Sequence, residues 1–113
     1  MKANDYQTLA WATAKPFYKT NVGGNHDAKV QQVTVLTLAL NGASGELSNE
    51  LKKMVENGEN IDVDILAYKL EDVLWYVAGL ATMLGIKLED LQGRNIQKLR
   101  ERYPGAVASY RQF

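Results

Sequence analysis

The stretch that decides the fold is Leu70–Leu84, which reads LEDVLWYVAGLATML. Two acids near its start, Glu71 and Asp72, precede an apolar run that only Gly79 and Thr82 interrupt. The run has no strict alternation and no proline and is too long for an ordinary strand, so it predicts a helix. A helix that is apolar on nearly all sides has to be buried on nearly all sides, and this one is too short for a bilayer, which takes roughly 20 apolar residues. We therefore expect the central helix of an α-helical bundle, covered in part by a second subunit.

Length and composition narrow the class of protein. With 113 residues the chain is expected to form one domain, 1–113, whose modest core would be completed by oligomerisation. The formal net charge of +0 argues against a nucleic-acid polymer as the partner. The chain has no cysteine, which excludes disulfides and thiolate chemistry, and its first residues lack the apolar run of a signal peptide. We expect a soluble, cytoplasmic protein that does not engage a membrane.

Cap and breaker residues divide the chain into four expected helices. These run from Tyr6 to about Lys15, from about His26 to Val55, from a cap at Asp62 or Asp64 to about Leu84, and from Leu88 to Arg102 or Tyr103. Pro16, Gly58, Gly85 and Pro104 end them, because proline and glycine stop helices at such positions. The predicted fold class is all-α, a four-helix bundle.

One part of the second helix, residues 30–40, also fits a strand, because it is rich in β-branched residues and partly alternating. A helix is favoured because one apolar stripe continues past this part at steps of three, four and seven. Its members are Leu36, Leu40, Leu47, Leu51 and Met54. Gly42 and Gly45 each cost about 1 kcal/mol relative to alanine in a helix. The helix is therefore expected to be kinked or closely packed there.

Carboxylates form the first candidate site. Glu46 and Glu50 are four residues apart and share a helix face. If the next helix runs antiparallel, Glu71 and Asp72 converge on them, and oxygen ligands of this kind suit Mg²⁺. The simpler alternative is a solvated acidic surface in which Glu50 pairs with Lys53.

A polar stripe on the last helix is the second candidate. Asn95, Lys98 and Arg102 fall at steps of three and four, and an amide, an ammonium and a guanidinium in one row suit a triphosphate. An ordinary solvated face is the alternative.

Aromatic residues are the third candidate. Trp11, Trp75 and Tyr76 are candidates for stacking on a nucleobase. Trp75 and Tyr76 lie inside the apolar run, which favours a place in the core for these two rings. His26 is the only histidine, so a transition-metal site is not expected.

Four passages of the chain resemble the MazG-like nucleotide pyrophosphohydrolases. They are Asp5-Tyr6-Gln7, GASGELSNELKK at residues 42–53, LEDVLWYVAGLA at residues 70–81 followed by Leu84-Gly85-Ile86, and NIQKLRERYP at residues 95–104. They lie in family order and cover nearly the whole chain. The resemblance implies a MazG-like helical bundle that forms a homodimer or a dimer of dimers. It also implies Mg²⁺-dependent hydrolysis, with Mn²⁺ as a substitute, of a nucleoside triphosphate to the monophosphate and pyrophosphate.

The metal site that the resemblance implies is altered in this chain. The family has Glu-x-x-Glu on one helix and Glu-x-x-Asp on the next, but here Ala43 and Lys69 replace the leading acids. Glu46 and Asp72 therefore carry over as metal-binding and catalytic residues, and Glu50 and Glu71 are candidates to complete a remodelled set. Lys69, expected beside Asp72, would repel a metal ion. Two unit charges at about 4 Å interact by roughly 4 kcal/mol at an effective dielectric of 20.

The altered site leaves two main functions open. The first is a house-cleaning pyrophosphohydrolase whose phosphate contacts come from Asn95, Lys98 and Arg102, with Lys69 as an added contact. The alternative is a catalytically inactive relative, nucleotide-binding or merely oligomeric, in which Lys69 replaces the charge of the metal. A third alternative is a bundle that serves only protein interaction.

Overall fold

The computed structural model of the protein describes residues 1–20 and 26–106. Within these ranges every regular element is a helix. The helices are α1 (Ala3–Ala12), α2 (Pro16–Lys19), α3 (His26–Glu56), α4 (Val63–Met83) and α5 (Leu88–Arg102). The predicted all-α class is confirmed, and residues 30–40 are helical as favoured. The short α2 was not expected as a separate helix; it begins at Pro16, whose fixed φ suits the first position of a helix.

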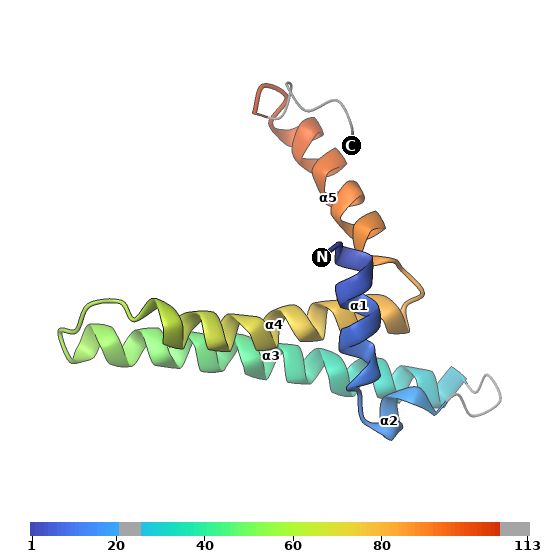
Figure 1. The fold of residues 1–113 in the computed structure, drawn as a ribbon, viewed down its shortest axis with the longest axis horizontal. Helices are drawn as coiled ribbons and strands as arrows, with labels where there is room; N and C mark the ends of the chain where they lie inside the picture. The colour runs from blue at the N-terminus through green and yellow to red at the C-terminus, as the bar shows by residue number, and fades with distance from the viewer. Residues whose placement is uncertain (21–25, 107–113) are drawn as a thin grey trace.

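α3 and α4 form a long hairpin of two antiparallel helices (Figure 1). α3 continues as one helix through Gly42 and Gly45, and a Cβ at either position would meet nothing within 4 Å. Neither glycine is therefore closely packed within this chain, which removes one of the two expected explanations for them. Asp62 caps α4, as predicted, by accepting hydrogen bonds from the backbone N–H groups of Asp64 and Ile65 at 3.1 and 3.2 Å.

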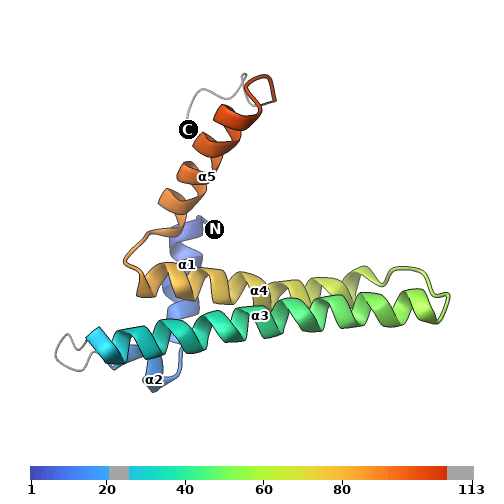
Figure 2. The same cartoon turned by 180° about the vertical axis from the view of Figure 1, so that it is seen from behind.

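α1 crosses the hairpin over the C-terminal part of α4, which both views show (Figures 1 and 2). The indole N–H of Trp75 donates to the carbonyl oxygen of Ala10 at 3.2 Å and to Thr13 Oγ1 at 2.9 Å. Gly79 allows the close approach of α3, α4 and α1, because a Cβ there would lie 3.3 Å from Leu36 Cδ2, which is a tight contact. This glycine sets how tightly the three helices meet.

α5 projects away from the hairpin and contacts the chain mainly near its own start (Figure 1). Side chains of α1 cap that start. Gln7 Oε1 accepts from the N–H of Leu88 at 2.7 Å, and Asn4 Oδ1 accepts from the N–H of Glu89 at 2.9 Å. The position of α5 is therefore fixed by the N-terminal helix, which lies over 80 residues earlier in the chain.

A single chain buries little apolar surface. Among the described residues the buried hydrophobic side chains are Ala10, Ala14, Leu36, Ala43, Met54, Ala78, Ala81 and Leu88. Leu70, Leu74 and Leu84 of the central stretch are 55%, 47% and 53% exposed. α3 and α1 cover only part of α4, so one chain alone does not bury this stretch on nearly all sides.

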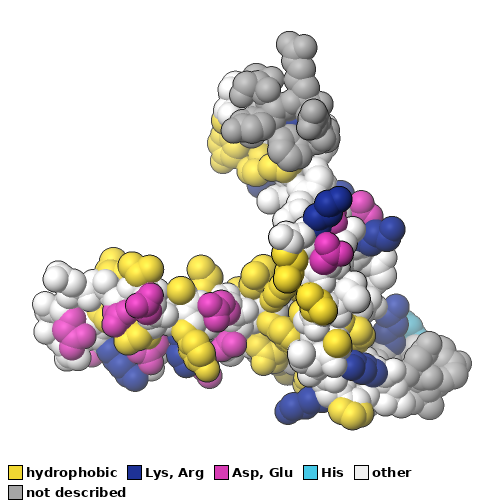
Figure 3. Space-filling model, viewed as in Figure 1, with side chains coloured by type: hydrophobic (Ala, Val, Ile, Leu, Met, Phe, Trp, Pro, Cys, Tyr) yellow, Lys and Arg dark blue, Asp and Glu magenta, His cyan; other side chains and the backbone are white. Residues whose placement is uncertain are grey.

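Hydrophobic side chains remain exposed along the hairpin and in the corner between α4 and α5 (Figure 3). None of the helices in the described ranges combines the length and apolar character needed to cross a membrane.

Candidate functional site

An ion pair bridges the hairpin where the resemblance predicts a metal site. Lys69 Nζ on α4 lies 3.4 Å from Glu46 Oε2 on α3. The Lys69 side chain is 27% exposed and that of Glu46 is 63% exposed. The expected neighbour of Lys69 was Asp72, and that expectation is corrected: the long lysine side chain extends across the hairpin to α3 and pairs there.

The four candidate carboxylates do not gather in one place. Glu50 pairs with Lys53 at 3.8 Å, as the surface alternative predicted. Glu71 is near Tyr6, where burial first and this carboxylate second raise the pKa of the phenol above its ordinary value. Over residues 1–20 and 26–106, no group of three or more acids or histidines is placed to hold a metal ion. Consecutive residues of a helix point in different directions, so Glu71 and Asp72 cannot both face α3.

Asp72 lines a pocket of about 270 Å³ between the α1–α2 turn and α4. Its other lining residues are Thr13, Lys15, Tyr18, Trp75 and Tyr76. Asp72, Trp75 and Tyr76 share one face of α4, because they lie three and four residues apart. The carboxylate of Asp72 makes no hydrogen bond or ion pair with the described part of the chain. It is therefore available to a ligand.

The aromatic walls of this pocket are fixed in place. The rings of Trp75 and Tyr76 meet edge to face at 5.2 Å and 85°, a favourable geometry for an aromatic pair. The two hydrogen bonds of the Trp75 indole to α1 and Thr13 hold that ring further. The expectation that Trp75 and Tyr76 pack inside is met in part, since both are half-buried and both line the pocket.

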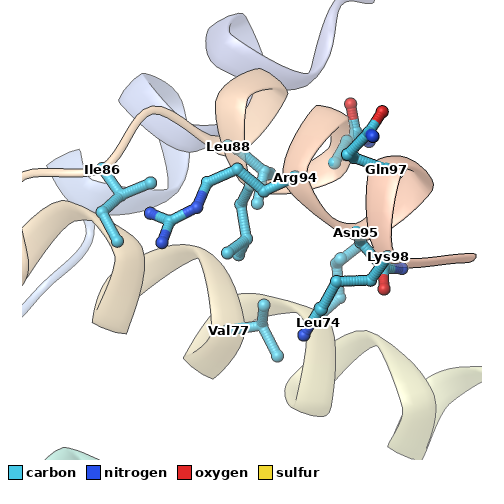
Figure 4. Close-up of a pocket in the computed structure, with 10 residues that line it drawn as sticks. Leu74, Val77, Ile86, Leu88, Arg94, Asn95, Gln97 and Lys98 are labelled. Atoms are coloured by element: carbon cyan, nitrogen blue, oxygen red, sulfur yellow. The ribbon is translucent and has the colours of Figure 1, made fainter. Parts of the chain in front are cut away.

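A second, larger groove of about 810 Å³ lies between α4 and α5 (Figure 4). Its apolar lining comes from α4, the connecting turn and the start of α5: Leu74, Val77, Ile86, Leu88 and Leu91. Asn95 and Lys98, predicted as phosphate contacts, line it from α5, whereas Arg102 does not.

Sequence reasoning missed Arg94, which lines this groove and extends toward Ile86 (Figure 4). Its place four residues before Lys98 was the available signal.

Trp11, the predicted nucleobase contact, lies elsewhere. It lines a separate depression with Gln7, Thr8, Thr82, Gly85, Ile86 and Lys87. Its ring is half-buried and would lie 3.7 Å from a Cβ at Gly79. Packing against α4 therefore accounts for Trp11 within one chain.

Lys69 and the α5 residues also lie apart. Lys69 turns toward α3, whereas Asn95 and Lys98 face the other groove. Besides the depression at Trp11, one chain thus presents the hairpin ion pair, the Asp72 pocket and the α4–α5 groove.

Comparison with known proteins gives a relative but no described activity. No family model matches the chain, and no solved structure matches it. The "Gene 37 protein" of Mycobacterium phage L5 is 34% identical over 77 residues, which cover 65% of this chain and 68% of the phage protein. This identity and coverage exceed what chance similarity produces. The chain belongs to the family of the Gene 37 protein of Mycobacterium phage L5.

Proposed function

We propose that this protein binds nucleoside triphosphates in a MazG-like arrangement in which Lys69 supplies the positive charge that a metal ion would otherwise bring. The observation that carries the proposal is the ion pair between Lys69 and Glu46, which bridges α3 and α4 at 3.4 Å. The Lys69 ammonium offers the phosphates a cation and repels a divalent ion placed beside it. At about 4 Å and a dielectric of 20, even two unit charges interact by roughly 4 kcal/mol. Such a penalty lowers metal affinity by about two to three decades.

The proposal includes a second copy of the chain. Leu70, Leu74 and Leu84 are about half exposed, and the α4–α5 groove is lined mainly by apolar side chains. Exposed apolar surface of this extent is typical of interfaces between subunits. A homodimer, or a dimer of dimers, would cover α4 and complete the helical bundle. It would also bring Asn95, Lys98 and Arg102 of one subunit toward the hairpin of the other, which one chain alone does not do.

Hydrolysis is the second candidate, and the free carboxylate of Asp72 favours it. Mg²⁺ commonly binds one or two carboxylates together with substrate phosphates. Glu46 and Asp72 lie apart in one chain, so in this version one of them alone would hold Mg²⁺ or Mn²⁺ together with the phosphates of a bound nucleotide. The ion would neutralise the phosphate charge. A carboxylate would orient the water whose oxygen bonds to the α-phosphorus while the bond to pyrophosphate breaks. Catalysis in this version needs Lys69 to leave Glu46.

One set of variants separates the two candidates. Calorimetry with nucleoside triphosphates, in EDTA and in Mg²⁺, measures binding, and pyrophosphate release measures turnover. We expect binding in EDTA that falls at least tenfold in Lys69→Met, persists in Lys69→Arg, and is unchanged in the control Lys52→Met. Lys52 is the matched control because its pair with Glu56 lies on the exposed surface of α3.

The outcomes are distinct. Turnover by the unaltered chain that disappears in Asp72→Asn would establish the hydrolase and overturn the metal-free proposal. We expect instead that turnover and Mg²⁺ affinity appear only in the double variant Ala43→Glu, Lys69→Glu. This variant restores the two acids that the MazG-like family has at these positions. Absence of nucleotide binding under every condition would overturn both candidates.

A further inference from the structure

The Asp72 pocket has the size and lining of a site for a single planar heterocycle. Drug-sized ligands occupy clefts of about 300–1,000 Å³, and this pocket, at about 270 Å³, is smaller. Three aromatic side chains line it: Tyr18 from α2 and the Trp75–Tyr76 pair from α4. Aromatic side chains bind nucleobases by stacking, with a contribution of about 1–3 kcal/mol per base. The pocket therefore suits a base, with sugar and phosphates outside it.

The polar lining gives the pocket a hydrogen-bonding pattern. Asp72 carries a carboxylate that accepts hydrogen bonds at two oxygens and, among the described residues, has no partner. Lys15, at the α1–α2 turn, lines the same pocket and carries an ammonium that only donates. The two charges make no ion pair with each other. An acceptor pair and a cationic donor are thus offered to a ligand at one site.

We infer that this pocket selects guanine, with Asp72 accepting hydrogen bonds from its N1–H and N2–H groups and Lys15 donating to O6. Guanine carries two adjacent N–H donors beside a carbonyl acceptor, which matches this lining. Uracil and thymine place a carbonyl on each side of a single N–H, so one carbonyl faces the carboxylate and repels it. Adenine lacks a donor at N1. The inference rests on the proposed nucleotide binding and gives Asp72 a role in reading the base.

Inosine triphosphate is the sharpest probe, because it differs from GTP only by the missing 2-amino group. With the full chain in EDTA, we expect calorimetry to show GTP binding about tenfold more tightly than ITP, since one hydrogen bond to a charged group is lost. ATP and UTP are expected to bind about a hundredfold more weakly than GTP. Asp72→Asn should reduce this range of affinities to within about threefold, because an amide presents its own N–H group to the base.

Two controls keep the outcome interpretable. Asp90→Asn removes an exposed acid from α5 and should leave the preference for GTP unchanged. Tyr18→Ala should weaken the binding of all four nucleotides, because every base presents a π-face for stacking. Circular dichroism melting curves check that each variant is folded.

Equal affinities for GTP and ITP, or a preference for GTP that persists in Asp72→Asn, would overturn the inference and leave the proposed nucleotide binding in place. If none of the four nucleotides binds, the proposed function itself fails.

Discussion

The side chain of Gln7 joins three parts of the fold, and its removal is the most informative test of how α5 is held. Gln7 Nε2 donates to Thr82 Oγ1 at 3.1 Å and to the carbonyl oxygen of Ile86 at 2.8 Å. Gln7 Oε1 accepts from the backbone N–H of Leu88 at 2.7 Å. Gln7→Ala removes all three bonds and leaves backbone groups of Ile86 and Leu88 without that partner.

The expected loss follows from these contacts. A typical hydrogen bond contributes about 0.5–1.5 kcal/mol net, and a buried polar group left without a partner costs about 1–3 kcal/mol. Both backbone groups lie in a partly buried setting, and Leu88 is only 6% exposed. Some water can reach them, so we expect the free energy of unfolding to fall by about 2–3 kcal/mol in Gln7→Ala. That is a large share of the roughly 5–15 kcal/mol that stabilises a typical protein.

Urea unfolding followed by circular dichroism measures this loss, at one fixed protein concentration because association raises apparent stability. Amide hydrogen exchange should also speed up over the first turn of α5. The matched control is Gln97→Ala, since Gln97 makes one exposed bond to Glu101 at 3.3 Å; its expected loss is about 0.5 kcal/mol or less. Equal losses in Gln7→Ala and Gln97→Ala would refute the reasoning that α1 anchors α5.

Three further predictions concern other parts of the fold. Gln32→Met should lower the free energy of unfolding by about 1–2 kcal/mol, because Gln32 Nε2 donates to the carbonyls of Phe17 and Thr20 at 2.7 and 2.8 Å. Urea unfolding would measure this loss, and the exposed control Gln31→Met should change the free energy of unfolding by about zero. Gly79→Leu should lower the free energy of unfolding by about 1–3 kcal/mol, because the new side chain crowds Leu36. Gly42→Ala should raise it by up to about 1 kcal/mol, because a Cβ at Gly42 has no atom within 4 Å. Thermal melts that showed Gly79→Leu to be the more stable variant would contradict the packing described at Gly79. Stability should fall as pH rises from the ordinary pKa of tyrosine through the raised pKa of Tyr6, because the phenol loses its proton at a lower pH in the unfolded chain than in the folded one. Tyr6→Phe should reduce this fall in stability. Glu71→Gln should lower the pKa of Tyr6, which phenolate absorbance would measure.

Local signals in the sequence predicted the bounds of α3, α4 and α5 well, whereas the first helix, expected from Tyr6 to about Lys15, is α1 at Ala3–Ala12. The cap at Asp62 and the stops at Gly58 and Gly85, both with positive φ, lie where glycine and cap chemistry placed them. The long apolar stripe through Leu36 correctly favoured a helix over a strand for residues 30–40. These signals act within a few residues, so one sequence is enough to recognise them.

The arrangement of the helices was not predictable in the same way. The position of α5 depends on Asn4 and Gln7, whose partners are 81 to 85 residues away. No period or spacing encodes such a contact. The positions of the candidate site residues were unpredictable for a similar reason. Spacing places Glu46 and Glu50 on one helix face. Only the packing of the helices shows that Lys69 pairs with Glu46 and that Asp72 faces the α1–α2 turn.

The exposed apolar surface of the single chain and the separation of its candidate site residues both bear on the second copy proposed above. Leu36 is the only large side chain that the described residues bury fully, while Leu74 is 47% exposed at the α4–α5 groove. A chain of 113 residues depends on burying most of its apolar surface for stability. The proposed second copy would cover this surface, and the same contact would carry Asn95 and Lys98 toward the partner's hairpin. Association and phosphate binding are then one structural event, so a substitution such as Leu74→Glu should abolish both together rather than either alone.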